Sequence, residues 1–467
     1  MFHFLGLLLV ASGQRRSLPG KSNDPSIALP LPRSYEFHVA PMQGYTNAPL
    51  RHLFQLLSPD AILWTEMEKV KDLLGADDLA IQKRFGDLEK QHDNRHRLTL
   101  QLGGNDAFAM EKCVSGLLQS GYQFREINLN CGCPSIEAGG ADYGASLMKQ
   151  PALTRTLFEA IGNACRSSNI HNTHMPAISL KCRTAVFDDI NDLEFAMTSS
   201  PDEKWWKDEH FQSLCEYIDQ AQLGGISHVV LHSRPAILSG LSPTKNRLIP
   251  PLDYDFVEQV ASEFPALRVT LNGGIQTLQD LKTEKMNRRN HIKGESRGVS
   301  TIGSHMAGRW LLRSPMSLLA IQHRILDSKD RANNVVPWDD IFAGAIEKYM
   351  RYVEGSIDKK IHPWSELCLP LYLAIEELRT GFEEDAEEHL ILHAQDDVQW
   401  ASEHFLYETM KEAVERMVLR LPGSKQGKSK AIPREIHWKR LSSALKNIVG
   451  TKVYNKWRRN RKELLPS

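Results

Sequence analysis

The stretch EINLNCGCPSIEAGGADYGASLM, residues 126–148, decides the fold. It begins as a strand, because Ile127 and Leu129 alternate with polar residues. The strand then breaks at Gly132 and Pro134, which permit a sharp turn and remove an amide donor. This places Cys133 at the tip of a strand on a glycine-rich loop, a position that suits proton transfer or nucleophilic attack. The plain alternative is a buried structural cysteine, which behaves as a small hydrophobic residue.

Seven further short apolar strands repeat this pattern, and most of them precede a helical segment. They are predicted at residues 37–40, 61–64, 98–102, 177–180, 228–231, 269–271 and 299–303. Strands that alternate with helices form parallel sheets, and eight such repeats predict a closed (β/α)8 TIM barrel of the α/β class. We place this barrel at residues 35–315. Asp106 is the expected N-cap of the helix predicted at residues 107–120.

Polar residues follow the ends of the predicted strands. They are Gln43, Gln101, Asn130, Cys133, Lys181, His232 and Asn272. Active sites of such barrels lie at the C-terminal ends of the strands, so a ring of polar residues there predicts a shared site. Taken singly, each has a non-functional alternative: His232 as a core histidine, and Lys181 as a solvated residue at a strand end.

The last two strands are followed by glycine turns that suit a phosphate. The turns contain Asn272, Gly273 and Gly274 after the seventh strand, and Gly308 with Arg309 after the eighth. Barrels often bind a phosphate at these loops, where glycine lets backbone amides approach an anion. With Pro41, Met42, Gln43 and Gln101 available for a flat ring, the pattern favours flavin mononucleotide (FMN). The alternative is two ordinary turns.

After residue 315 the strand pattern disappears, and residues 316–467 are predicted as an all-helical domain with helices at 341–353 and 405–419. The formal net charge of +0 conceals an acidic segment at 376–397 and a basic one at 425–462. The basic segment, with Trp438 and Trp457, predicts an RNA backbone clamp at 428–445. We expect residues 457–462 to be a disordered tail. Residues 192–210 and 282–297 are expected to be surface insertions.

The seven cysteines are odd in number and irregular in spacing, which fits a reducing compartment. No second Cys/His pair accompanies Cys131 and Cys133, so neither a structural zinc site nor another metal site is expected. Residues 1–34 are predicted to be a disordered or targeting segment, because the apolar run at 2–10 is too short to span a bilayer. The compartment stays open between cytoplasm and an organelle, plastid or mitochondrion.

Six motifs carry a resemblance to a known family. They are APMQGYTNAPLR, LQLGGND, EINLNCGCPS, LKCRTA, HSRPAILSGLSPTKNRLIPPLDY and LNGGI. Together with Gly308 and Arg309, they resemble the tRNA-dihydrouridine synthases over residues 37–315, and the long SGLSPTKNRLIPPLDY run is most similar to the A-type subfamily.

The resemblance implies an enzyme that uses FMN, reduced by NADPH, to saturate the C5–C6 bond of D-loop uridines 20 and 20a in tRNA. Hydride would reach C6, and Cys133 would protonate C5. FMN contacts are implied for Pro41, Met42, Gln43, Gln101, Lys181, His232, Asn272, Gly273, Gly274, Gly308 and Arg309. Contacts with tRNA are implied for Asn130, Arg234, Lys245, Asn246 and Arg247. No membrane and no obligate protein partner are expected.

Two other functions remain alternatives. The chain could be another FMN barrel that reduces a small pyrimidine or enone, or a non-catalytic RNA-binding or chaperone protein that retains the fold. The basic loop 245–247 argues against the first, and Cys133, Lys181 and His232 argue against the second. The choice between uridines 20 and 20a, the oligomeric state and the roles of the insertions stay open.

Overall fold

The structure is a computed structural model that describes residues 35–86, 97–134, 143–168, 175–198, 208–281, 302–322, 326, 338–383, 443 and 445–464. Within it, Pro32–Ser467 forms one compact unit. The segment 1–34, the insertion 282–297, the helix expected at 405–419 and nearly all of the clamp expected at 428–445 lie outside the described residues. The domain boundary at residue 315 stays a prediction.

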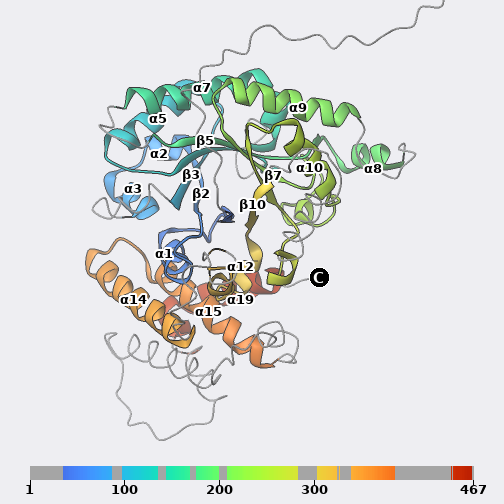
Figure 1. The fold of residues 1–467 in the computed structure, drawn as a ribbon. Helices are drawn as coiled ribbons and strands as arrows, with labels where there is room; N and C mark the ends of the chain where they lie inside the picture. The colour runs from blue at the N-terminus through green and yellow to red at the C-terminus, as the bar shows by residue number, and fades with distance from the viewer. Residues whose placement is uncertain are drawn as a thin grey trace, which may run out of the picture. The chain divides into compact units, whose positions relative to one another are not determined.

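Eight parallel strands form the barrel that the sequence predicts (Figure 1). In spatial order they are β1 (Glu36–Val39), β10 (Ile302–Ala307), β9 (Arg268–Asn272), β7 (His228–His232), β5 (Ala177–Arg183), β4 (Glu126–Cys131), β3 (Leu98–Gly103) and β2 (Leu63–Lys69). Ile62 closes the ring, because its carbonyl accepts from Val39 N at 2.8 Å and its amide donates to Phe37 O at 2.9 Å. A two-stranded sheet of β6 (Val186–Phe187) and β8 (Ala236–Ile237) lies beyond β5 and β7 in the chain.

Helices surround the barrel, and α7 contacts both α5 and α9 (Figure 1). The helices between the strands are α1 (Ala48–Leu57), α2 (Val70–Leu74), α3 (Asp78–Phe85), α5 (Ala107–Gln119), α7 (Pro151–Ser167), α8 (Ile190–Thr198), α9 (Asp208–Leu223) and α10 (Tyr254–Glu263). Asp106 caps α5 as predicted, accepting from Ala109 N at 2.9 Å. No helix within the described ranges is long and apolar enough to cross a membrane.

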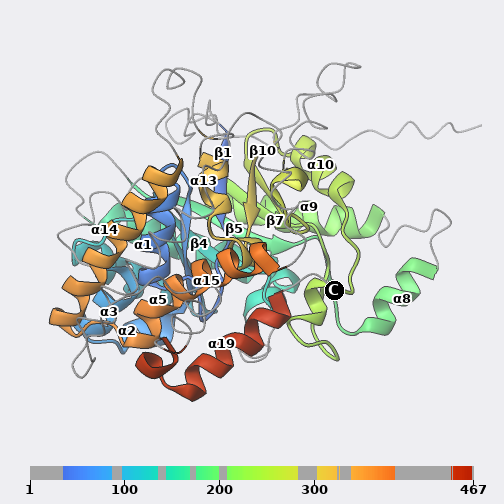
Figure 2. The same ribbon diagram turned by 90° about the horizontal axis from the view of Figure 1, so that it is seen from below.

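Past β10, the described part of the chain is helical. The elements are α12 (Arg309–Arg313), α13 (Ser317–Ile321), α14 (Trp338–Lys359), α15 (Trp364–Glu383) and α19 (Thr451–Leu464). Figure 2 shows α14 beside α1, and both α14 and α15 contact α1. The helix expected at 341–353 is therefore confirmed within α14.

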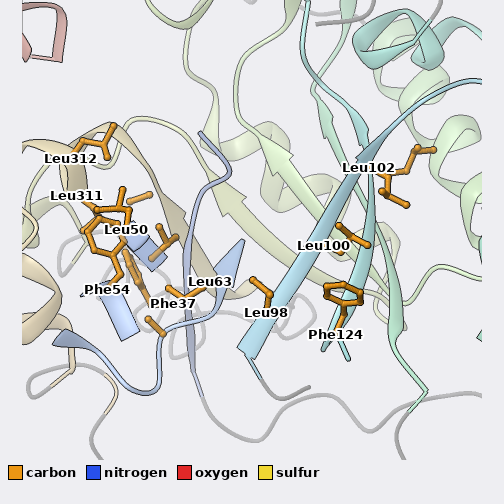
Figure 3. Close-up of a cluster of buried hydrophobic side chains, with 14 of the residues drawn as sticks. Phe37, Leu50, Phe54, Leu63, Leu98, Leu100, Leu102, Phe124, Leu311 and Leu312 are labelled. Atoms are coloured by element: carbon orange, nitrogen blue, oxygen red, sulfur yellow. The ribbon is translucent and has the colours of Figure 1, made fainter. Parts of the chain in front are cut away.

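The two-residue period of β3 explains how the core forms. Leu98, Leu100 and Leu102 are buried in the layer that also contains Phe124, which lies beside β3 in Figure 3. Gln101 lies between these leucines in sequence, and its side-chain Nε2 donates to Asn128 Oδ1 of the neighbouring strand at 2.9 Å. Alternate residues of a strand face opposite sides, so the leucines pack under the helices and Gln101 lies in the barrel interior.

Two expectations need correction. The eighth strand continues to Ala307, past the predicted end at residue 303, and its polar residues Ser304 and His305 are buried. Residues 192–210, expected to be a surface insertion, include most of α8 and the start of α9. Residues 457–462 are not a disordered tail, because they belong to α19, in which Trp457 is 9% exposed.

Charged side chains fill the barrel at the N-terminal ends of the strands. Buried Glu126 contacts His228 Nδ1 at 2.9 Å and Arg268 Nη2 at 2.7 Å. His228 Nε2 lies 2.7 Å from Thr270 Oγ1. Burial opposes ionisation of Glu126, but His228 and Arg268 outweigh it and lower its pKa. Burial and Arg268 lower the pKa of His228 to about 4, so the folded state favours a neutral imidazole and an ionised carboxylate.

We expect Glu126→Gln to destabilise the protein by about 3–5 kcal/mol at neutral pH, because it leaves Arg268 and His228 with less compensation in the interior. The wild type should lose stability as pH falls from 6.5 towards 4, since His228 takes up a proton in the unfolded chain before it does so in the folded one. Below that range the lowered pKa of Glu126 adds a further loss in the same direction. Urea unfolding followed by circular dichroism measures both effects.

The matched control is Glu159→Gln, which removes a carboxylate from the exposed Arg155–Glu159 pair of 2.7 Å on α7. That change should cost less than about 1 kcal/mol. Equal losses in the two variants would show that the interior network is not a special contributor to stability.

Candidate functional site

Strand register brings the predicted site residues to one end of the barrel interior. Asn130 of β4 pairs with Lys181 of β5, and His232 of β7 pairs with Asn272 of β9. Asn272 in turn pairs with Met306 of β10, two residues before Gly308. Because all these strands are parallel, their C-terminal ends meet at the same mouth.

Asn130 connects the mouth to the cysteine loop. Its Nδ2 donates to Gln101 Oε1 at 2.9 Å, and its Oδ1 accepts from Gly132 N at 3.2 Å and Cys133 N at 3.1 Å. The side chain of Gln101 is 1% exposed and is held by Asn128 and Asn130. An asparagine fixed in this way sets the direction in which the backbone leaves β4.

A second contact fixes Cys133 from the other side of its loop. Its carbonyl accepts from Ala145 N at 3.0 Å. Gly144 has a φ of +74°, and a Cβ on it would lie 2.5 Å from Cys133 O, so glycine is required there. Residues 135–142 lie outside the described residues. Cys133 is half-buried, whereas the other six cysteines, all in described parts of the chain, are buried.

Five basic side chains gather at the mouth. We call them the cation cluster: Lys181, Arg183, Arg234, Arg247 and Arg309. Burial, with Arg183 nearby, lowers the pKa of Lys181 to about 8. Burial, with Arg247 and Arg234 nearby, lowers the pKa of Arg183 to about 9. Within the described residues no member forms an ion pair with a carboxylate. Such a site favours an anionic ligand.

The thiol lies inside the field of this cluster. Lys181, Arg183 and Arg247 each interact electrostatically with Cys133. Burial, together with Arg183 and Lys181, lowers the pKa of His232 well below its usual value. His232 is therefore neutral at physiological pH, and its ring can donate or accept a hydrogen bond without adding charge.

The two predicted glycine turns are held close to other site residues. Gly273 has a φ of +109°, and a Cβ on it would come within 2.6 Å of the His232 ring. Tyr254 Oη donates to Gly273 O at 3.0 Å, and Asn272 Nδ2 donates to Met306 O at 3.0 Å. At the other turn, a Cβ on Gly308 would come within 3.1 Å of Met42 Sδ, so the turn before Arg309 lies against the segment of Pro41 and Met42.

Gln43 is positioned less directly. Its Nε2 donates to Glu66 Oε2 at 3.0 Å on the exposed rim. Burial raises the pKa of Glu66. The implied contact of Gln43 with a cofactor stays a prediction.

The loop expected to contact RNA is fixed by its own side chains. Asn246 is fully buried and bonds both Ile237 O, at 2.9 Å, and Ile237 N, at 2.8 Å. Arg234 donates to the carbonyls of Leu248 and Pro250. In this structure Asn246 therefore shapes the loop and Lys245 is its exposed cation, while the implied RNA contacts of Arg234, Lys245, Asn246 and Arg247 stay predictions.

Sequence reasoning assigned no role to Arg183, which connects the two loops. Its Nε donates to Gly132 O at 3.1 Å, and its Nη1 donates to Pro235 O at 3.1 Å and Asn246 O at 3.2 Å. Arg183 follows Lys181 by two residues, so the strand period places both on the same side. That spacing is the signal that could have found it. Tyr254, which holds Gly273, carries no comparable signal because it begins a helix after a long loop.

A family model described as dihydrouridine synthase (Dus) matches residues 38–196 and 204–362, more than half of the chain. The chain belongs to this family. The resemblance found in the six motifs is thereby confirmed.

Several relatives carry the name tRNA-dihydrouridine(20/20a) synthase. The one from Xanthomonas axonopodis pv. citri is 35% identical over 246 residues, 53% of this chain and 63% of the relative. The match thus spans less than two thirds of that protein. The one from Xanthomonas campestris pv. campestris is 31% identical over 71% of this chain and 83% of the relative. The relative from Escherichia coli K12 is 32% identical over 64% of this chain and 71% of its own length.

Among solved structures, morphinone reductase in complex with tetrahydroNAD matches 64% of this chain and 89% of its own, with 8% identity and a TM-score of 0.37. The old yellow enzyme homologue from Zymomonas mobilis matches 65% of this chain and 93% of its own, also with 8% identity and a TM-score of 0.37. These likenesses are too distant for an argument about the site.

We expect an alkylating reagent such as iodoacetamide to modify Cys133 before any other cysteine of the native protein, because the other six are buried. Peptide mass spectrometry after brief exposure identifies the labelled residue. The fast reaction should vanish in Cys133→Ala and persist in Cys131→Ala. Rapid labelling of Cys131 in the folded wild type would contradict the positions of the two thiols.

Proposed function

We propose that the chain is a flavin-dependent, NADPH-driven enzyme that reduces the C5–C6 bond of D-loop uridines 20 and 20a in tRNA to dihydrouridine. The observation that carries the proposal is the half-buried thiol of Cys133 within the field of the cation cluster, at the mouth of a barrel of this family. The names of the relatives support the substrate.

The residues at the mouth fit FMN by their chemistry. Arg309 beside the Gly308 turn, with Lys181 charged at neutral pH, suits a phosphate and an electron-rich ring. Neutral His232 and the amide of Asn272 offer hydrogen bonds that do not disturb this charge. Met42, next to Gly308, offers a soft apolar surface to a ring face. When bound, reduced flavin supplies a hydride to C6 of the uracil.

The cation cluster and the loop around Lys245 suit the RNA backbone. A uracil stacked inside folded tRNA cannot reach a barrel mouth, so the base must be extruded while the protein holds the phosphates. Neutralising phosphates releases counterions, and this supplies much of the affinity. The exposed Lys245 and the half-buried Arg247 are adjacent to the entrance and serve this role.

Cys133 completes the reduction by donating a proton. Addition of hydride at C6 moves the π electrons into an enolate over C5, C4 and O4. The S–H bond of Cys133 then breaks as a C5–H bond forms, and the sulfur keeps the electron pair. Lys181, Arg183 and Arg247 stabilise both the enolate and the resulting thiolate by their positive charge. Asn130 holds the Cys133 backbone in place during this step.

We expect Cys133→Ala to lower the rate of dihydrouridine formation by about 100-fold or more, the usual contribution of a general acid. Purified protein, FMN and NADPH are incubated with unmodified tRNA transcript, and the product is quantified by mass spectrometry. Reduction of the flavin by NADPH should be unaffected, since Cys133 does not take part in it.

Three results would change the proposal. An unaffected rate in Cys133→Ala would leave the reaction in place and remove the proton role. A flavin that NADPH reduces but that never yields dihydrouridine would favour a small pyrimidine or enone as substrate. A colourless protein that does not bind FMN would favour a non-catalytic RNA-binding role.

Lys245→Ala should weaken tRNA binding similarly for all tRNA sequences, because a phosphate contact carries no sequence information. The slope of log affinity against log salt should become shallower by about 1. Fluorescence anisotropy over a series of salt concentrations measures the slope. Lys112→Ala, which removes an exposed lysine from α5 on the outer face of the barrel, is the control and should leave it unchanged. Identical slopes in the two variants would rule out the phosphate contact.

A further inference from the structure

The C-terminal helix α19 has two distinct faces. Tyr454, Trp457 and Arg461, spaced at i, i+3 and i+7, are buried. The aromatic pair packs on Tyr372 of α15, with ring centroids 5.6 and 5.2 Å from it. The other side is basic and exposed, with Lys452, Lys456, Arg458 and Arg459. The buried side of the helix therefore has a structural role that the basic composition of the helix does not indicate.

This structural role concerns α12, the helix that begins with Arg309. Helix α19 contacts α12 directly, and Figure 1 shows the two side by side. Arg461 Nη1 lies 3.5 Å from Arg313 O, at the end of α12, and Arg461 Nε lies 3.8 Å from Glu376 Oε2 of α15. Both Arg461 and Glu376 are less than a tenth exposed. A buried charge of this kind is retained only with a partner, so Glu376 fixes where the guanidinium lies.

Two further contacts restrict α12. Arg313 Nη2 donates to Gln276 O at 3.0 Å, which joins α12 to the loop that follows Gly273 and Gly274. Met316 N donates to Glu377 Oε2 of α15 at 2.9 Å. The short α12 thus lies between the glycine turn of β9 and the two helices α15 and α19. A shift of its C-terminal end would move Arg309, which is one helical turn away.

We propose that Arg461, held by Glu376, is a positioning residue for the phosphate end of the cofactor site. It acts through α12, by keeping Arg309 and the Gly308 turn at the distance that a phosphate monoester requires. This inference rests on the proposed function, because it takes the group bound there to be FMN. The same helix thereby contributes to the cofactor site through its buried face while its basic face remains in solvent.

The test compares two ligands that differ only in the phosphate. Apoprotein is titrated with FMN and with riboflavin, and flavin fluorescence gives each dissociation constant. Arg461→Met, which keeps bulk without charge, should weaken FMN binding by about tenfold. Riboflavin binding should change less than about twofold, because riboflavin has no phosphate for Arg309 to contact. A purely structural defect would weaken both ligands equally.

Further variants keep the test decisive if Arg461→Met folds poorly. Glu376→Gln retains the shape of the side chain and should also lower the preference for FMN over riboflavin. Arg458→Met, on the exposed face of α19, should change neither dissociation constant. Arg309→Ala should abolish the preference for FMN over riboflavin. Adding Arg461→Met to Arg309→Ala should then cause little further loss, since both act on one contact.

The failures of the two proposals are distinguishable. If Arg309→Ala removes the FMN preference but Arg461→Met and Glu376→Gln leave it intact, the positioning role is wrong and the proposed function stands. If the wild type binds both flavins equally, the phosphate site is absent and the positioning role falls, while flavin dependence stands. If it binds neither flavin, both proposals fall.

Discussion

Closure of the barrel is the constraint on which the rest of the structure depends. Ile62 joins β1 to the start of β2 through two backbone hydrogen bonds, so the eight-stranded barrel has no open edge. In a closed barrel every second residue of each strand must lie in a narrow interior. Polar side chains there are tolerated only when they bond to one another, as Gln101, Asn128 and Asn130 do. The position of Cys133 follows from that network, because Asn130 holds its backbone.

Positive charge is balanced by carboxylates at one end of the barrel interior and is not balanced at the other. At the N-terminal ends of the strands, cations are balanced: Arg268 contacts Glu126 at 2.7 Å and Glu36 at 3.5 Å. At the C-terminal mouth, the cation cluster has no carboxylate among the described residues to balance it. The same strands supply both ends, since β4 carries Glu126 and Asn130. Unbalanced buried charge is costly unless a ligand completes it, so the mouth has the electrostatics of a binding site and the opposite end those of a scaffold.

The fold was largely predictable because apolar strands recur at regular intervals. The fourth strand and the Asp106 cap follow from local patterns, and both are confirmed. The predicted eighth strand ended too early because its inward residues, Ser304 among them, are polar, and an apolar run is a poor guide where the barrel interior is polar. Nor could the loop sequence reveal that Asn246 turns inward while Lys245 faces solvent. That outcome depends on the backbone of Ile237, nine residues away, and on no local propensity.

The C-terminal helix shows the same limit over a longer distance. A run of lysines and arginines predicts a solvated surface, and most of α19 conforms to this. Arg461 departs from it because the fold brings Glu376, which is distant in sequence, within 3.8 Å of its Nε. Glu376 begins the acidic segment and Arg461 lies at the end of the basic one, so the two oppositely charged parts of the chain meet in this buried pair. An ion pair gains most where water is excluded, and it cannot be replaced by contacts with like-charged neighbours on the same helix. The segregation of charge that cancels in the total of +0 therefore has a structural use, which is to bring the last helix of the chain to the barrel at the end of α12.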